Sequence, residues 1–241
     1  MLVTRPDPDA GDTAARLAAL DIEAALCPLL SHQTLPTSLP DASGFAAVAL
    51  TSANALRALD QRGVIGAYAH LPVFAVGDRT ASLARDLGFA RVQSASGAFG
   101  DLVSLLAHAG LKGPIFYPAG REQSGDLAKS LAPFGVMVIT SQVYAMNAIA
   151  ELPAQILGEL EDGSIDAALF YSRRTAAAFA RLCEGRLSRL ARLDIGMLCM
   201  SEAIAEPLID AHFVRIGLAD HPSEEAMMAL ALSFARDRNA S

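Results

Sequence analysis

The sequence predicts an α/β protein made of two similar domains, each a set of βαβ units around a parallel sheet, and three observations support this prediction. Short apolar segments alternate with helical segments of about ten residues along the whole chain. Segments of the first half recur in the second half. Two long extended runs lie where the chain would cross between domains. We therefore expect two flavodoxin-like or Rossmann-like domains with parallel sheets, joined by a two-stranded extended linker.

Each apolar segment is short enough for a buried parallel strand, and each leads toward a segment with helical spacing. The expected strands are Leu2–Thr4, Ile22–Leu26, Phe45–Leu50, Val73–Val76, Arg91–Val92, Pro114–Tyr117, Val136–Ile139, Ala167–Tyr171, Ile195–Met200 and Phe213–Ile216. The expected helices are Asp12–Leu20, Ala53–Asp60, Arg79–Leu87, Phe99–Ala109, Gly125–Ala132, Pro153–Glu161, Thr175–Cys183, Ala203–Asp210 and Ser223–Ala235. This alternation predicts helices on both faces of each sheet.

The internal repeat relates the two halves of the chain. Three pairs of segments are similar: Ala47–Ser52 with Ala167–Ser172, Asp86–Val92 with Asp210–Ile216, and Arg16–Leu30 with Ser130–Tyr144. Chance similarity between apolar βα units is the alternative explanation. Matched order along the chain favours two related domains.

The extended runs predict how the chain divides. Val136–Asn147 is longer than a buried strand of about five or six residues, so only its first half, Val136–Ile139, is expected to be a core strand. A similar run starts at Ile22 and continues through Thr37. Domain 1 is therefore expected to be discontinuous (residues 1–28 and 147–241), with domain 2 at residues 38–138 and linker strands at residues 29–37 and 139–146.

Composition narrows the class of protein. The 241 residues are 52% hydrophobic and 19% charged, with a net charge of −7, which is globular and disfavours nucleic acid as the main partner. No apolar run reaches the roughly 18 residues of a membrane span, and no signal peptide is expected, so we expect no membrane partner and a cytoplasmic protein. Cys27, Cys183 and Cys199 are expected to be reduced, which suits that location.

Hydroxyl residues and glycine gather where expected strands lead into helices. These turns are Thr4–Pro6, Thr51–Asn54, Gly77–Thr80, Ala119–Arg121, Ser172–Thr175 and Ser201–Ala203. Ligands of parallel sheets bind at the carboxyl ends of strands, and helix starts offer backbone N–H groups to anions. Four of the six turns add arginine, which suits carboxylate or phosphate. One such turn is typical of an ordinary N-cap beside a solvated arginine, but six together predict a polyanion site.

The sequence lacks a dinucleotide fingerprint, a phosphate loop and a nucleophile elbow. The histidines (His32, His70, His108, His212 and His221) lack metal-ligand spacing and are expected to be core or surface residues. Tyr144, at the end of the second extended run, is the candidate for chemistry, because a phenol can donate a proton to a leaving group. Packing at a domain junction is the commoner role of such an aromatic residue.

Several short motifs occur in a fairly specific order and spacing. They are Leu2–Pro6, Leu50–Asn54, Ala75–Ala81, Tyr117–Glu122, Val143–Tyr144, Phe170–Ser172 and Pro222–Met228. Together they resemble the uroporphyrinogen-III synthase family over nearly the whole chain. The resemblance implies two βαβ domains joined by a two-stranded linker, in a monomer.

The resemblance also implies a function. It indicates a cyclising hydro-lyase (a carbon–oxygen lyase) of porphyrin, tetrapyrrole and heme biosynthesis, with neither cofactor nor metal. Its substrate is hydroxymethylbilane, a linear tetrapyrrole with eight carboxylates, which it closes to uroporphyrinogen III in the cleft between the domains, with loss of water and inversion of the last ring. Tyr144 matches the tyrosine thought to assist departure of the substrate hydroxyl. The implied substrate-binding positions are Thr4, Arg5, Thr51, Ser52, Asn54, Gly77, Thr80, Gly120, Arg121, Ser172, Arg173 and Ser201.

One turn departs from the family pattern. Met200–Ala205 lacks the Gly and Thr found at Gly77–Thr80, and Glu202 would face an anionic ligand unfavourably. The alternative function is a non-catalytic, cytoplasmic two-domain protein that binds a small polyanion, since hinged βαβ pairs bind ligands between lobes.

Overall fold

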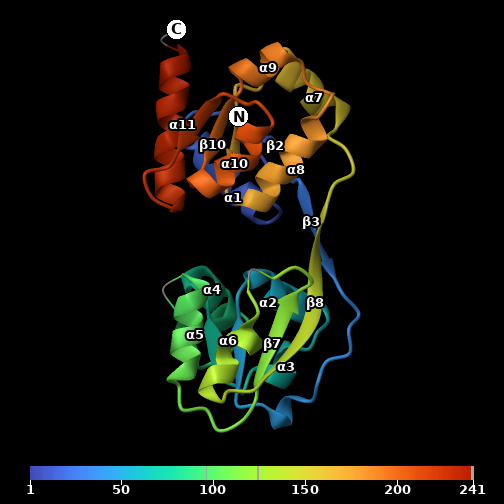
Figure 1. Cartoon of the computed structure of the whole chain (residues 1–241), viewed down its shortest axis with the longest axis vertical. Coiled ribbons are helices and arrows are strands. Elements are labelled where there is room, and N and C mark those ends of the chain that lie inside the picture. The colour runs from blue at the N-terminus through green and yellow to red at the C-terminus, as the bar shows by residue number, and fades with distance from the viewer. Residues whose placement is uncertain (96, 124, 240–241) are drawn as a thin grey trace. The chain divides into compact units, whose positions relative to one another are not determined.

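The chain folds into two compact units, each with its own sheet, in a computed structural model that describes residues 1–95, 97–123 and 125–239 (Figure 1). Unit 1 is made of Met1–Ser31 and the chain from Asn147 onward, and unit 2 is His32–Met146. The domain boundaries expected at residues 28, 38, 138 and 147 stay a prediction. None of the described helices is long and apolar enough to cross a membrane.

Unit 1 is built on a parallel sheet in the order β11-β10-β9-β1-β2. Its strands are β1 (Leu2–Val3), β2 (Ala25–Leu26), β9 (Ala167–Phe170), β10 (Gly196–Cys199) and β11 (Arg215–Leu218). Every residue of β9 and β10 is buried, which explains their unbroken apolar sequences. The strand order reverses between β1 and β9, as at the switch point of a flavodoxin-like sheet.

Helices cover both faces of this sheet. They are α1 (Asp9–Ala18), α7 (Ala154–Glu161), α8 (Arg173–Cys183), α9 (Arg189–Asp194), α10 (Glu202–Asp210) and α11 (Glu224–Asn239). Phe170 and Met197 point into one core with α7, α8, α9 and α10, while Leu169 and Leu198 point into another with α1 and α11. The side chains alternate between the two cores because successive residues of a strand face opposite sides. Cys27, Cys183 and Cys199 are free thiols buried in unit 1.

Unit 2 has a sheet in the order β3-β8-β7-β4-β5-β6. Its strands are β3 (Leu30–Thr34), β4 (Ala47–Leu50), β5 (Val73–Ala75), β6 (Val92–Ser94), β7 (Ile115–Gly120) and β8 (Val138–Ala148). Four neighbouring pairs of strands are parallel: β8 with β7, β7 with β4, β4 with β5, and β5 with β6. Along the segment of β3 and the residues after it, the hydrogen-bond partners in β8 come from progressively earlier residues. The Leu35 N–H donates to the Val143 carbonyl (2.8 Å), and the Thr37 hydroxyl donates to the Gln142 carbonyl (2.6 Å). The β3–β8 pair is therefore antiparallel.

Helices also cover both faces of the second sheet. They are η1 (Ala42–Gly44), α2 (Ala53–Gln61), α3 (Ile65–Tyr68), α4 (Asp78–Asp86), α5 (Phe99–Ala107), α6 (Leu127–Leu131) and η2 (Ala132–Phe134). Leu102 of α5 and Leu127 of α6 pack in one core with Phe74 of the sheet. On the other face, the ring of Tyr68 stacks on Phe116 with centroids 4.8 Å apart.

The two sheets have the same topology when unit 1 is read from a different starting strand. Read as β9, β10, β11, β1 and β2, unit 1 has its strands in the same spatial order as β4, β5, β6, β7 and β8 of unit 2. The similar segments found in the sequence lie on equivalent elements: β4 with β9, the α4–β6 region with the α10–β11 region, and the α1–β2 region with the α6–β8 region. The repeat is thus a circular permutation, and the predicted fold class is confirmed.

Several local predictions were wrong. Most of the run from Val136 to Asn147 lies in one strand of 11 residues, β8 (Val138–Ala148), rather than in a short core strand followed by a separate crossing. It pairs with β7 as far as Tyr144, with an irregularity at Ala119 and Gly120. Helices α3 and α9 were not predicted. Both are shorter than two turns, too short to show a helical period.

Candidate functional site

A cluster of ring-bearing and hydroxyl side chains lies in unit 2, where β4 and β7 end and β8 passes them. We call it the tyrosine cluster; its members are His32, Thr51, Tyr117, Gly120 and Tyr144. They come from β3, the β4–α2 turn, β7 and β8, so adjacent strands bring together residues that are far apart in the sequence. Parallel sheets bind ligands at this edge.

Tyr144 lies between residues of the two strands that flank β8. Its ring stacks on His32 of β3 with centroids 5.5 Å apart and planes 19° from parallel. From β7 comes Gly120, where an added Cβ would sit 2.8 Å from Tyr144 Cζ and 2.9 Å from its hydroxyl. Any side chain at position 120 would therefore displace the phenol. Only 8% of Tyr144 is exposed, so its side chain is packed, and it lies beside the carboxyl end of β7.

Tyr117 and Thr51 form the second part of the cluster. Their hydroxyls lie 2.9 Å apart, within hydrogen-bond distance. The pKa of Tyr117 is raised, mainly by burial; the hydrogen bond with Thr51 opposes this shift, and the nearby Tyr144 and Asp126 add to it. Tyr117 is thus a neutral phenol, which uses its hydrogen bond to orient Thr51.

His32 is tied to the start of α2. Its Nε2 lies 3.2 Å from the Asn54 carbonyl. A carbonyl only accepts, so Nε2 carries the proton. Burial is the main cause that lowers the pKa of His32, with a contribution from Arg57, and the bond to Asn54 opposes it. The Asn54 side chain accepts from Arg57 Nη1 (2.6 Å) and donates to Met146 Sδ (3.4 Å), so this predicted site residue has protein partners on both ends of its amide.

The other predicted positions of unit 2 lie at helix starts. Ser52 caps α2 and accepts from the Asn54 N–H (3.2 Å). Gly77 occupies the N-cap of α4 with no side chain, and Thr80 is buried in the first turn of that helix. Arg121 is exposed just after β7, where its N–H donates to the Tyr144 carbonyl (2.8 Å). Such helix starts attract anions through unpaired N–H groups.

In unit 1, two predicted carboxylate-binding residues already have partners at the switch point. Thr4 is fully buried and its hydroxyl donates to the Leu169 carbonyl (2.6 Å), so its side chain joins β1 to β9. Arg5 donates from Nη1 to Glu224 Oε2 (2.7 Å) and to the Thr13 hydroxyl (3.0 Å). Its guanidinium also lies over the Tyr171 ring, 4.0 Å from the centroid.

Glu224 closes this network from the first turn of α11. It accepts from Arg5, from the Tyr171 hydroxyl (3.0 Å) and from the Thr13 hydroxyl (3.3 Å). Burial is the main cause that raises the pKa of Tyr171, and Glu224 adds to it. The carboxylate that Arg5 binds in this structure is therefore an internal one.

The remaining positions of unit 1 lie at the starts of α8 and α10. Ser172 caps α8 and accepts from the Thr175 N–H (3.1 Å). Arg173 is largely exposed and pairs with Glu206 (3.2 Å). Ser201 stands at the N-cap of α10 but makes no side-chain cap hydrogen bond. Both turns follow the carboxyl ends of strands.

Comparison with known proteins assigns the chain to a family. A model described as uroporphyrinogen-III synthase HemD matches residues 11–229. The chain belongs to the uroporphyrinogen-III synthase family. A search of curated individual proteins found no match.

Two solved structures share the synthase fold. A uroporphyrinogen-III synthetase from Helicobacter pylori is 21% identical with a TM-score of 0.63, and the match covers 88% of this chain and 92% of that one. A mutant uroporphyrinogen III synthase from Thermus thermophilus is 17% identical with a TM-score of 0.54, and the match covers 100% of both chains. At these identities the likeness shows the fold.

Within this family fold, the structure brings together some predicted site residues and separates others. Thr51, Gly120 and Tyr144 meet in the tyrosine cluster, whereas Thr4 and Arg5 belong to internal networks of unit 1. Sequence reasoning missed His32, which was expected to be an ordinary core or surface residue. Tyr117 and Gly120 lie in one recognised motif, so the motif could have indicated Tyr117 as well.

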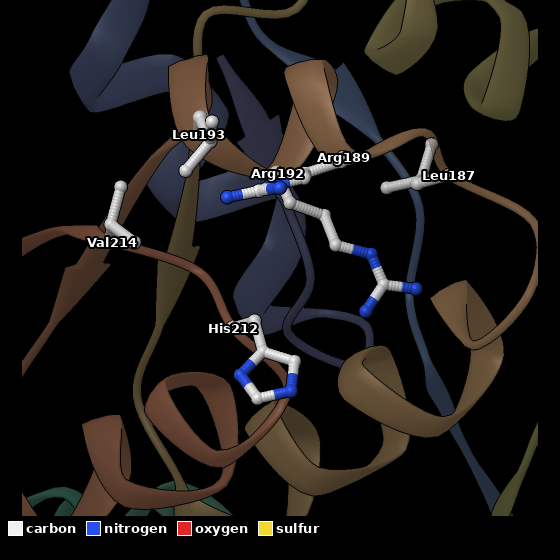
Figure 2. A pocket seen from close by; sticks show the side chains of 6 residues that line it. All are labelled: Leu187, Arg189, Arg192, Leu193, His212 and Val214. Carbon is white, nitrogen blue, oxygen red and sulfur yellow. The ribbon is translucent and has the colours of Figure 1, made fainter.

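A cavity of about 580 Å³ lies elsewhere in unit 1, away from the predicted positions of this synthase fold. Its lining includes Leu193, Val214, Arg189 and His212, and Figure 2 shows Leu193 and Val214 together at one end. These residues come from α9 and the segment before β11, at the amino-terminal edge of the sheet. Parallel sheets bind ligands at the other edge, so we do not assign the reaction to this cavity. Among the described residues, no group of His, Cys, Asp or Glu is arranged to hold a metal ion.

Proposed function

We propose that this member of the family cyclises hydroxymethylbilane to uroporphyrinogen III as a carbon–oxygen hydro-lyase, acting as a monomer in the cytoplasm. The observation that carries the proposal is the placement of Tyr144, packed between His32 and Gly120 at the ligand-binding edge of its sheet. Membership of the family supports the reaction. No observation favours the non-catalytic binding protein.

Substrate carboxylates are proposed to bind at the helix starts of both units. Ser52 and Gly77 stand at two of these starts in unit 2, and Ser172 and Ser201 at two in unit 1. Each start contributes about 0.3–1 kcal/mol toward an anion, so several together hold a polycarboxylate that no single turn would hold. Arg121 adds an exposed positive charge beside the tyrosine cluster. That the bilane lies between the two domains stays a prediction.

Tyr144 is proposed to assist the loss of water. The C–O bond of the hydroxymethyl group breaks and the hydroxyl leaves as water, assisted by the Tyr144 phenol, which donates a proton or a hydrogen bond to it. The remaining cation bonds to the carbon of the last ring that carried its methylene bridge, and the bond to that bridge breaks and re-forms at the ring's other α carbon, which inverts the ring. The protein must orient the last ring so that this attack is faster than direct closure. The proton that the last ring loses on closure returns to the Tyr144 oxygen where the phenol has donated its own, so the net change is the loss of one water.

The test is product analysis. Hydroxymethylbilane, made in situ by its upstream deaminase, is given to the purified chain, and the oxidised uroporphyrin isomers are separated. We expect mainly isomer III, and about a 10²-fold lower rate for Tyr144→Phe. Tyr68→Phe is the matched control and should keep the wild-type rate. The Tyr68 hydroxyl donates to the Pro40 carbonyl and lies outside the tyrosine cluster, on the face of the sheet where its ring stacks on Phe116. Only isomer I, as in the protein-free reaction, would favour the binding protein instead.

A further inference from the structure

The Tyr144 ring has one partner that the family motifs do not include. His32 lies in β3, which runs antiparallel beside β8, and both residues belong to unit 2. Their rings are nearly parallel, at 19°, with centroids 5.5 Å apart. A second ring stacked in this position restricts the rotation of the phenol.

His32 is itself fixed by the backbone. Its Nε2–H donates to the Asn54 carbonyl at 3.2 Å, and Asn54 lies in the first turn of α2. The imidazole is therefore anchored to a rigid helix at one edge and stacked on Tyr144 across its face. His32 therefore links the position of the phenol to that of α2.

Gly120 lies in β7, on the other side of β8 from β3. The main chain at Gly120 approaches the phenol so closely that a Cβ would lie 2.9 Å from the Tyr144 hydroxyl. Close to both Gly120 and the imidazole, the ring has little freedom. Reactions that depend on an oriented donor are sensitive to displacements of about 1 Å.

We propose that His32 is a positioning residue, which holds the Tyr144 phenol against Gly120 in the orientation that the cyclisation requires. It acts through Tyr144 and does not touch the substrate's reacting atoms. The inference rests on the proposed role of Tyr144, and it adds to that role a residue from β3.

Two substitutions separate stacking from the hydrogen bond. Both His32→Phe and His32→Leu remove the bond to Asn54, but only His32→Leu removes the ring. We expect His32→Leu to lower kcat for isomer III roughly three- to tenfold with KM unchanged, and His32→Phe to stay within about twofold of wild type. Equal losses in both variants would overturn the stacking role.

A double variant tests whether His32 acts through Tyr144. If it does, His32→Leu combined with Tyr144→Phe is within about twofold of Tyr144→Phe alone, because the donor whose position matters is already absent. Multiplied losses, with each substitution keeping its full separate effect, would overturn the proposal.

A spectroscopic readout keeps the inference testable apart from activity. The chain has 4 tyrosines, so ¹³C labelling of the tyrosine ring yields few signals, and Tyr144→Phe identifies the one of interest. We expect that signal to shift in His32→Leu, as the ring current of the imidazole is lost, and to shift less in His32→Phe. An unchanged Tyr144 signal in a folded His32→Leu chain refutes the contact. A wild-type chain that yields only isomer I refutes the proposed function and leaves this measurement unaffected.

Discussion

Replacing Gly120 with alanine tests the geometry of the tyrosine cluster directly. The new Cβ would lie 2.8 Å from Tyr144 Cζ and 3.1 Å from the Glu122 carbonyl oxygen, whereas ordinary contact begins near 3.4 Å. The phenol must therefore move by about 0.6 Å or more, and the stacked ring of His32 limits that movement. Since about 1 Å of misplacement can cost on the order of 10²-fold in rate, we expect kcat to fall roughly 10- to 100-fold. Overpacking would lower the free energy of unfolding by about 1–3 kcal/mol.

The assay is the initial rate of isomer III formation at saturating hydroxymethylbilane, together with urea unfolding. Gly66→Ala is the matched control, because this exposed glycine also lies in unit 2, in α3, and an added Cβ there meets nothing within 4 Å. We expect that variant to retain the wild-type rate. A folded Gly120→Ala protein with the wild-type kcat would refute the argument that the reaction needs the phenol in the position that Gly120 leaves room for.

Three further predictions concern stability. Glu224→Ala removes the acceptor of three hydrogen bonds and leaves Arg5, whose side chain is 13% exposed, without its closest carboxylate. Urea unfolding should therefore show a free energy of unfolding lower by about 2–4 kcal/mol. Glu206→Ala, which breaks an exposed pair, should lower it by less than about 1 kcal/mol, and equal losses would contradict this reasoning. Ser172→Ala should cost about 1 kcal/mol because its cap bond to the Thr175 N–H is lost, while Ser201→Ala, which has no such bond to lose, should cost only a few tenths, and the reverse order would be incompatible with the caps described. The hydrogen bond from Arg238 is the main cause that lowers the pKa of Asp194 below 3.8. The contribution of Asp194 to stability is therefore complete above that pH and is lost as the pH falls through the lowered pKa. The melting temperatures of wild type and Asp194→Asn should converge on acidification, and a constant difference between them would count against the pair.

The fold could be predicted to a large extent because its signals are local. The alternation of apolar strands and helices depends on residues close in the chain, and so do helix caps such as Ser52 and Ser172. The repeat also indicated which elements are equivalent. Short elements such as α3 and α9 left no periodic signal, and the continuity of β8 depends on pairing with β7, which is decided by the tertiary structure.

The site was less predictable, because the partner of each polar group is set by the topology. Arg5 has the residue type and place of a carboxylate receptor, but its partner Glu224 comes from α11 at the other end of the chain. Thr4 similarly donates to Leu169, a strand neighbour 165 residues away. His32 carried no motif, since its stacking partner is brought beside it only when β3 pairs with β8. Gly120 and Tyr144 were recognised through motifs, and no periodicity would have revealed their contact.

The permuted arrangement of the two units has a consequence for how the chain folds during synthesis. Unit 2 is continuous in sequence and is complete before β9, the neighbour of β1, has been made. Its two ends leave side by side, with the Leu35 nitrogen 2.8 Å from the Val143 oxygen. For unit 1, a folded unit 2 converts an insertion of about 115 residues into a short connection, which reduces the entropy cost of closing the chain by about 2–3 kcal/mol. We therefore expect unit 2 to assist the folding of unit 1, so that a loss of structure in unit 2 weakens unit 1 even where no side chain of unit 1 is changed.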